Sequence, residues 1–433
     1  MRKYLSLLTI VALCCGFLMG CNGTITEPEP ITPPDITEPT EPTGETEPNN
    51  SEPQTEKPYM PDVETSKLSK MELDSYILDT SYAKTGANTM FSPLSLDMAL
   101  GMVAEGAGSE YHNLFPRLLG KDNYADFAGQ YMERVDELNV ESNFEYNKYK
   151  TVFEIANSIW INNQSSPLSS YIQKVNSFNP ELQNVNFADT EKIVADINTW
   201  CKIKTHDMIE QVVTENSFTP NSKTVLVNAI YFESPWLEPW NISNDKTFYC
   251  FDETKEVKMI ETVTPYYYEN DKATAFGAVY KNGLLFIGIL PKDNGEFTVS
   301  ELNIKELLDS QTMDYDVTAK MPAFKFDNEV EGLVEALKDT GYGILFDSSV
   351  CMFSQMLENE PLFISDIIQI DAIEVDENGT KAAAATAVIM DKNSAIMEEP
   401  KTKDVVLDRP FVFLIYDPVM EQIVFLGKVV DPA

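Results

Sequence analysis

Histidine is nearly missing from this chain of 433 residues, which contains only His112 and His206. A nucleophilic triad with a histidine base would need one of these two residues. Neither stands in a metal-binding spacing such as His-Glu-x-x-His. The sequence also lacks a Gly-x-Ser-x-Gly turn and a glycine-rich phosphate loop. We therefore predict that the protein is not an enzyme and that it needs no metal and no cofactor.

Basic residues are scarce as well. The chain has 32 Lys and Arg against 69 Asp and Glu, which gives a formal net charge of -37. Such an acidic surface repels nucleic acids and anionic lipid head groups, so we expect no nucleic-acid partner. Hydrophobic residues make up 43% of the chain, and this is enough for a large core.

Cysteine is too sparse for a disulfide framework. Three of the six cysteines lie in the first 21 residues, and the other three, Cys201, Cys250 and Cys351, are scattered. Their spacing fits neither a set of paired cysteines nor a zinc site. We expect these three to be buried and to behave as small apolar residues.

The N-terminus carries an export signal. Arg2 and Lys3 precede an apolar run, Leu5 to Leu18, that is too short to span a bilayer comfortably. The run ends in Leu-Met-Gly-Cys, which resembles the bacterial lipobox, whose cysteine receives lipid. We predict a lipoprotein signal peptide over 1–20 and a lipid anchor on Cys21. The protein would then sit in the bacterial cell envelope, on the outer-membrane surface or outside the cell. An ordinary cleaved signal peptide is the alternative.

Residues 21–61 are dominated by Pro, Glu and Thr and contain almost nothing apolar. Such a segment cannot bury enough surface to offset its chain entropy. Proline and like-charge repulsion keep it extended, so we expect a disordered tether.

Residues 62–433 have a globular composition. Helices are predicted over 67–84 and 92–106, the second from its Ser-Pro start. Strands are predicted at five later segments rich in β-branched and aromatic residues: 151–161, 223–232, 283–291, 410–417 and 422–430. Helices come first and strands later without regular alternation, which indicates an α+β fold with large, mostly antiparallel sheets.

The segment from Asp376 to Ala395, DENGTKAAAATAVIMDKNSA, allows two interpretations. Four alanines favour an exposed helix. The alternation favours a strand, because the even positions from 380 to 390 are all small or apolar and both charges, Lys381 and Asp391, fall on the other face. Helical spacing gives no such stripe. We therefore interpret the segment as a strand held in reserve, with Gly379 as a permissive hinge.

Five segments together resemble the serpin family, in family order. They are NTMFSPLSLDMALGMVAEGA at 88–107, VLVNAIYFESPW at 225–236, MPAFKFD at 321–327, DENGTKAAAATA at 376–387 and VVLDRPFVFLI at 405–415. The resemblance implies a serpin fold: a helical bundle region, three mostly antiparallel sheets and an exposed reactive loop over about 378–403. It also implies a suicide-substrate mechanism, in which the loop is cut, the protease is held as an acyl-enzyme, and the loop inserts into the central sheet.

The resemblance assigns roles to individual residues. The hinge comprises Glu377, Gly379, Thr380, Ala382, Ala383, Ala384 and Ala385. The reactive bond falls at Lys392, Asn393 or Ser394: counting from Glu377 favours Asn393, while a trypsin-like pocket favours Lys392. Met390 and Met397 would suit chymotrypsin- or elastase-like enzymes. The buried cluster beneath the parting strands, called the shutter, comprises Ser92, Ser95, Asn228 and Gln369. Trp236 lies near the entrance to the sheet, called the breach.

Two positions depart from the family pattern. Gln369 stands where the family often has histidine, although glutamine can still donate and accept hydrogen bonds. Ala323 stands where a lysine often pairs with the hinge glutamate, so Glu377 must find another partner or water. Core packing is the alternative reading of all these positions.

We therefore expect a monomeric inhibitor of serine proteases, with cysteine proteases as a second target class. A non-inhibitory serpin that acts as a surface binding protein is the alternative. A stalked adhesin or enzyme on the same tether is a third hypothesis, for which the sequence offers no site.

Overall fold

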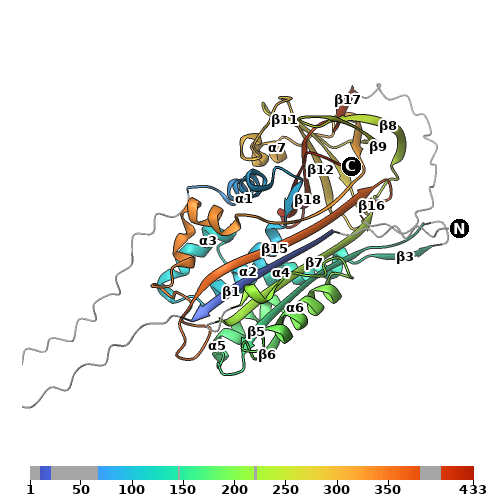
Figure 1. The fold of residues 1–433 in the computed structure, drawn as a ribbon. Coiled ribbons are helices and arrows are strands. Elements are labelled where there is room, and N and C mark those ends of the chain that lie inside the picture. The colour runs from blue at the N-terminus through green and yellow to red at the C-terminus, as the bar shows by residue number, and fades with distance from the viewer. Residues whose placement is uncertain (1–9, 21–66, 145–146, 219–221, 381–400) are drawn as a thin grey trace, which may run out of the picture.

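The computed structural model describes residues 10–20, 67–144, 147–218, 222–380 and 401–433. Within these ranges the chain forms three large sheets, one short hairpin and eight α-helices. The long strands of the first sheet run diagonally through the molecule, and the other two large sheets lie toward one end of them (Figure 1).

The first sheet has seven strands. From one edge to the other the order is β14, β15, then β1 and β16 end to end, then β7, β5 and β6. Their bounds are β1 Ile10–Gly20, β5 Val152–Asn162, β6 Pro180–Val185, β7 Ser222–Pro235, β14 Phe324–Glu329, β15 Leu362–Asp376 and β16 Gly379–Thr380. Neighbours are antiparallel except for β5 and β6. β1 comes from the segment predicted as a signal peptide.

The second sheet has six strands in the order β10, β11, β12, β18, β19, β2, and the third has four in the order β17, β13, β9, β8. The bounds in the second are β2 Thr89–Phe91, β10 Tyr267–Glu269, β11 Ala273–Val279, β12 Leu285–Pro291, β18 Phe411–Asp417 and β19 Gln422–Val429. In the third they are β8 Asn241–Tyr249, β9 Thr254–Thr264, β13 Tyr315–Pro322 and β17 Lys401–Val406. The hairpin joins β3 Glu141–Phe144 to β4 Asn147–Lys150.

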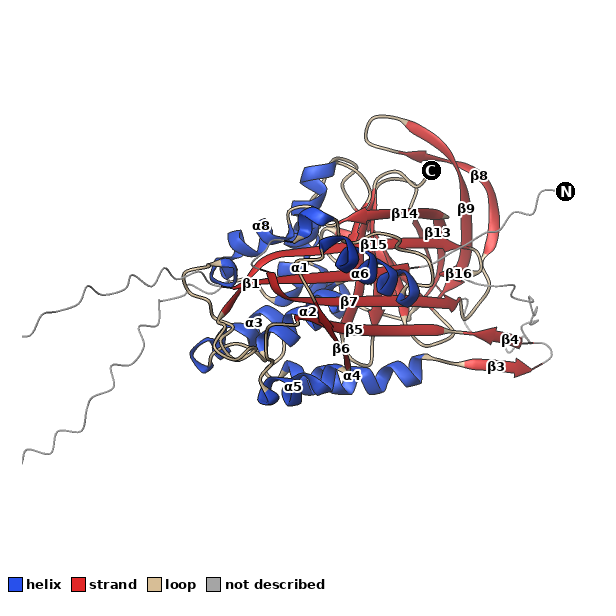
Figure 2. Ribbon diagram, turned by 60° about the horizontal axis from the view of Figure 1, so that its bottom comes forward, coloured by secondary structure: helices blue, strands red, loops and turns tan. Residues whose placement is uncertain are grey.

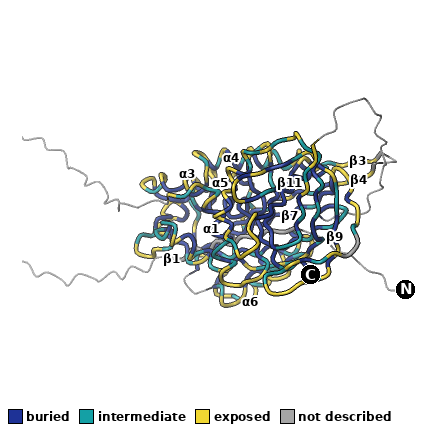
Figure 3. The backbone as a smooth tube through the Cα atoms, turned by 90° about the horizontal axis from the view of Figure 1, so that it is seen from above, coloured by how far each residue is buried: buried dark blue, intermediate teal, exposed yellow. Residues whose placement is uncertain are grey.

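The helices cover both faces of the first sheet (Figure 2). Their bounds are α1 Lys70–Thr85, α2 Pro93–Ala104, α3 Phe115–Leu119, α4 Tyr124–Leu138, α5 Ser169–Val175, α6 Thr190–Lys204, α7 Ile304–Asp309 and α8 Leu333–Leu337. Alternation along β7 separates two cores: Leu226, Ile230 and Phe232 face the core that contains α2, whereas Val225, Val227, Ala229 and Tyr231 face the core that contains α6. The chain around β7 is accordingly mostly buried (Figure 3).

The predicted elements agree with those observed. The helix predicted at 92–106 is α2, and Ser92 caps it by accepting a hydrogen bond from the Ser95 amide. The five predicted strands correspond to β5, β7, β12, β18 and β19. The α+β class with mostly antiparallel sheets is confirmed. Among the cysteines, Cys201 is buried and free as expected, but Cys250 is partly exposed and Cys351 is disulfide-bonded.

Candidate functional site

A tight turn after β15 brings the hinge into the first sheet. The backbone amides of Asn378 and Gly379 donate to Asp376 Oδ1 at 2.7 and 3.3 Å. Gly379 has φ of 150°, and a Cβ there would lie 2.4 Å from the carbonyl oxygen of Ser234 on β7. Glycine is needed at this position because the backbone passes too close to β7 for any side chain.

Thr380 is fully buried at the start of a strand position between β15 and β7. Its backbone pairs with Val375 on one side and with Ser234 on the other. Its Oγ1 lies 2.5 Å from the hydroxyl of Tyr280, and either atom can be the donor. Burial raises the pKa of Tyr280, so its hydroxyl keeps its proton and can serve this contact. The hinge threonine is therefore part of the sheet and has a hydrogen-bond partner.

Trp236 holds the entrance to this strand position. Its ring stacks on Tyr280 with centroids 4.4 Å apart, and its indole N–H donates to the Asp376 carbonyl at 2.8 Å. Its backbone amide donates to the Asn378 carbonyl at 3.0 Å. The structure thus places the predicted breach tryptophan directly against the hinge turn.

Glu377 has a partner other than the lysine of the family pattern. Its carboxylate forms an ion pair with Lys258 of β9 at 2.5 Å. Lys258 lies beside Ala323, the position at which the family often has a lysine. The carbonyl of Lys258 accepts a hydrogen bond from the Ala323 amide at 2.9 Å. Lys258 of β9 therefore takes the place of the family's lysine as the partner of Glu377.

The four predicted shutter residues meet in one hydrogen-bonded network. The Ser95 amide donates to Ser92 Oγ at 3.1 Å, and Ser95 Oγ donates to Asn228 Oδ1 of β7. From β15, Gln369 Nε2 donates to the Ser92 carbonyl at 3.1 Å. All four residues are fully buried. The start of α2 therefore reaches both β7 and β15 from beneath.

One strand position separates β7 from β15. β1 fills it and runs antiparallel to both neighbours, so that the backbone of Cys14 pairs with Asn228 on one side and Gln369 on the other. The two shutter side chains thus come from strands on opposite sides of the position, which we call the slot. In Figure 1, β1 lies between β15 and β7 along their length.

β16 enters the slot in line with β1. Thr380 pairs with Ser234, and Ile10 pairs with Phe232, which precedes Ser234 by two residues in β7. Both segments run antiparallel to β7. A strand that continued from Thr380 would therefore meet the place that β1 occupies.

The order of these segments matches a known family. A family model described as serpin (serine protease inhibitor) matches residues 76–432. The chain belongs to the serpin family. A serpin-like protein of Thermococcus kodakarensis, described as uncharacterized, is 28% identical over 445 residues and is covered to 99%, with 100% of this chain. Chicken neuroserpin (Gallus gallus) is 26% identical, with 80% of this chain and 86% of that protein covered.

Solved serpin structures share the fold. The native thermophilic serpin tengpin matches with a TM-score of 0.66 and 25% identity over 85% of this chain and 96% of its own. The native stressed form of an Arabidopsis serpin, AtSerpin1, matches with a TM-score of 0.67 and 23% identity, covering 84% and 97%. The serpin fold predicted from the sequence is therefore confirmed.

Two residues of the serpin shutter were not predicted. Asn157 of β5 accepts a hydrogen bond from Asn228 Nδ2 at 2.7 Å, which extends the network across β7. Asp371 of β15 lies two residues beyond Gln369 on the same face and is fully buried. Alternation along each strand places both on the core face, but only the packed structure shows which inward polar groups touch.

Several predicted residues lie outside the described residues. These are the lipidation site Cys21, the hinge residues Ala382, Ala383, Ala384 and Ala385, and the reactive-bond residues Lys392, Asn393 and Ser394. The residues described on either side of the predicted reactive loop are Thr380 in β16 and Lys401 in β17, and both lie at the end of the molecule that carries β8 and β9 (Figure 1).

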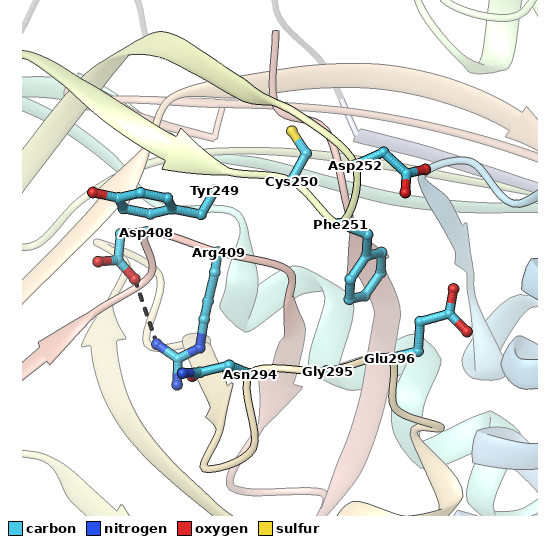
Figure 4. A pocket seen from close by; sticks show the side chains of 9 residues that line it. All are labelled: Tyr249, Cys250, Phe251, Asp252, Asn294, Gly295, Glu296, Asp408 and Arg409. Atoms are coloured by element: carbon cyan, nitrogen blue, oxygen red, sulfur yellow. Dashed lines mark hydrogen bonds and ion pairs between the residues drawn. The ribbon is translucent and has the colours of Figure 1, made fainter.

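A surface hollow of about 590 Å³ lies apart from the slot, between the end of β8 and the start of β18 (Figure 4). Arg409 reaches into it, donating to Asp408 at 3.4 Å and to the Pro291 carbonyl at 2.7 Å. The free thiol of Cys250 lies on its wall, and burial together with Asp431 raises the pKa of that thiol. A thiol of this kind is a poor nucleophile, so we assign the hollow no catalytic role.

The two histidines contact residues other than those of the shutter, the hinge turn and the hollow. His206 Nε2 lies 3.0 Å from Glu154 Oε2, and its ring packs on Tyr231. His112 Nε2 lies 3.2 Å from the Ala107 carbonyl. Over the described ranges, no group of three or more His, Cys, Asp or Glu residues is arranged to hold a metal ion. In the same ranges, no helix combines the length and the apolar character needed to cross a bilayer.

Proposed function

We propose that this serpin is a suicide-substrate inhibitor of serine proteases, with cysteine proteases as a second target class. The protease serine attacks the carbonyl carbon of the reactive bond and forms an ester, while the new amino end leaves. Lys392 is the first candidate for the residue that carries this ester, and Asn393 is the second. The cut loop then enters the slot as a strand, and the attached protease is carried along before water can hydrolyse the ester.

The position of Thr380 carries this proposal. Thr380 is already paired with both β15 and β7, so the loop starts inside the sheet at the mouth of a strand-wide slot. By the pairing with β7, a continuing strand would bring residue 382 to the place of Ile10. Each added residue would gain backbone hydrogen bonds on two sides, at about 1 kcal/mol net per bond. Small alanines in the hinge suit rapid entry between two existing strands.

The N-terminal segment must leave the slot before the loop can enter. We propose that residues 1–20 are removed as a lipoprotein signal peptide and that Cys21 then anchors the protein in the bacterial envelope through residues 22–61. The anchored protein would act as a monomer at the outer-membrane surface or outside the cell. Replacing Cys21 with Ser should abolish incorporation of labelled fatty acid and release the protein from the membrane fraction. Unchanged labelling would contradict the anchor.

A non-inhibitory binding role is the second candidate. One structural neighbour is thyroxine-binding globulin in complex with thyroxine, with a TM-score of 0.66 and 22% identity. That structure supports the binding role only because it shows a protein of this fold with a bound ligand. The fully buried Thr380 and the small hinge residues favour inhibition, because a bulky or charged hinge would oppose entry into the core.

Incubation of the protein without residues 1–20 with trypsin, elastase and a subtilisin-like enzyme tests the proposal. Samples are separated on denaturing gels, and residual protease activity is measured in parallel. We expect a stable band at the combined mass of inhibitor and protease. Two fragments of the serpin together with fully active protease would reject inhibition and leave the binding role.

A further inference from the structure

Exposed apolar side chains of this serpin gather on and beside the third sheet. The structure describes eight large hydrophobic residues as exposed, and five of them lie in β8 or β9 or within four residues of a strand of this sheet. These five are Leu237, Ile242, Tyr249, Val263 and Met313. Apolar side chains that cluster in this way are typical of surfaces on which another molecule docks.

Leu237 and Val263 line one hollow of about 190 Å³, which we call the third-sheet pocket. Leu237 is 43% exposed and Val263 is 61% exposed. Trp240 and Tyr266 also line this pocket, and among the described residues around it Glu238 alone is charged. The third-sheet pocket therefore suits an apolar side chain that a partner presents.

The third-sheet pocket lies between the hinge turn and β17, the described segments on either side of the predicted reactive loop. On one side, the amide of Trp240 donates to the carbonyl of Glu377 at 3.3 Å. On the other side, Val263 pairs with Thr318 of β13, which pairs with Asp404 of β17. Neighbouring strands lie about 4.8 Å apart, so the backbone of β17 is about 10 Å from Val263.

The length of the loop brings a bound protease within reach of this face. Lys392 precedes Lys401, the first residue of β17, by nine positions, and at about 3.3 Å per residue this segment spans at most about 30 Å. A globular protease of about 220 residues is roughly 40 Å across. A protease that holds Lys392 in its cleft can therefore contact the third sheet at the same time.

The charge of the third sheet does not oppose such a contact. Its four strands contain six lysines and five acidic residues, whereas the whole chain carries a net charge of -37. A nearly neutral face exerts little electrostatic repulsion on a partner of either sign. The apolar side chains can therefore determine which protease surfaces bind there.

We propose that the third-sheet pocket is a docking site for an apolar side chain on the surface of the target protease, next to the cleft that holds the reactive loop. This inference rests on the proposed inhibitory function. The contact holds the protease before the loop is cut, so fewer encounters dissociate before the protease serine attacks. It therefore raises the rate of capture and leaves the later competition between insertion and hydrolysis unchanged.

The test replaces Leu237 with Glu in the protein without residues 1–20. Leu182→Glu is the matched control, because Leu182 of β6 is also a leucine and is 48% exposed. Both variants and the wild type are incubated with trypsin, elastase and a subtilisin-like enzyme. For each protease that is trapped, we would measure the second-order rate constant for loss of protease activity and the number of serpin molecules consumed per protease.

With at least one of these proteases, we expect Leu237→Glu to lower the rate constant about tenfold or more, because the docked side chain loses an apolar contact of leucine size. Leu182→Glu should keep the wild-type rate constant. The number of serpin molecules consumed should be the same in all three proteins. A rise in that number for Leu237→Glu would overturn the docking role, because it would show that the substitution disturbs insertion instead.

Equal rate constants for Leu237→Glu and Leu182→Glu with every trapped protease would overturn the inference while leaving inhibition intact. Absence of a covalent complex in every sample would instead overturn the proposed function, and this inference with it.

A second pair of variants repeats the test if Leu237→Glu does not fold. Val263→Glu places the charge at another residue of the third-sheet pocket. Val419→Glu, in the turn between β18 and β19, is its matched control, because the two valines are 61% and 66% exposed. A lower rate constant for Val263→Glu than for Val419→Glu would support docking, and equal values would overturn it.

Discussion

Replacing Thr380 with Arg should convert this serpin from an inhibitor into a substrate. Thr380 is fully buried, and its hydroxyl contacts that of Tyr280 at 2.5 Å. An arginine would bring an unpaired cation into this place and leave the Tyr280 hydroxyl without its partner. An uncompensated buried charge costs about 3–5 kcal/mol.

Thr380 lies in the sheet before the loop is cut. An arginine would stay outside the sheet in the uncut protein, so the cost arises when the cut loop has to bring residue 380 into the core, and insertion slows. At about 1.4 kcal/mol per factor of ten, insertion would become roughly 100- to 3000-fold slower. Trapping depends on insertion outpacing hydrolysis of the acyl-enzyme. If insertion normally wins by about tenfold, a 100-fold delay leaves only about one acyl-enzyme in ten trapped.

The assay titrates trypsin with each variant and quantifies covalent complex and cleaved serpin on denaturing gels. Thr380→Ser keeps the hydroxyl and should inhibit almost as the wild type does. Thr254→Arg adds the same charge at an exposed residue of β9 and should leave trapping unchanged. A wild-type yield of complex from Thr380→Arg would refute the reasoning, because a cation would then have entered the core face without penalty.

Three further predictions concern other parts of the fold. Replacing Lys70 with Met leaves Asp74 and Asp97 without their cation. The free energy of unfolding measured in urea should then fall by about 3–5 kcal/mol at neutral pH. A loss below about 1 kcal/mol would contradict the interpretation that Lys70 compensates the two acids. A chain that retains residues 10–20 keeps the slot filled and should be cleaved by trypsin without complex, whereas removal of residues 1–20 should restore trapping; equal yields would show that β1 and the loop do not share a position. Lys258→Ala removes the partner of Glu377, but both side chains are partly exposed, so complex formation should change by less than about tenfold; a loss of all trapping would assign the pair a larger role.

Much of this fold is readable from local signals. The helix α2 is marked by Ser92 as its cap, by Pro93 at its first turn and by an apolar run. The long strands are marked by β-branched and aromatic residues between turn signals. These features act within a few residues of one another, so a single sequence can display them.

The contacts of the site depend on packing between distant segments. Glu377 pairs with Lys258, which is 119 residues away, and no local pattern indicates that choice. Asp371 looks like an ordinary acid in a strand until β15 is placed against α2 and the slot. The apolar run from Leu5 to Leu18 indicates an export signal by its composition, and the same composition also suits a strand such as β1, which pairs with β7 and β15.

The central claim is that the fold has a strand position that the reactive loop can fill with a gain in stability. Calorimetry on the chain without residues 1–20, before and after a single cut near residue 392, tests it most directly. For a domain of this size each kcal/mol raises the melting temperature by about 2 °C, so a gain of several kcal/mol should raise it by roughly 10 °C or more. An unchanged melting temperature after the cut would contradict the claim.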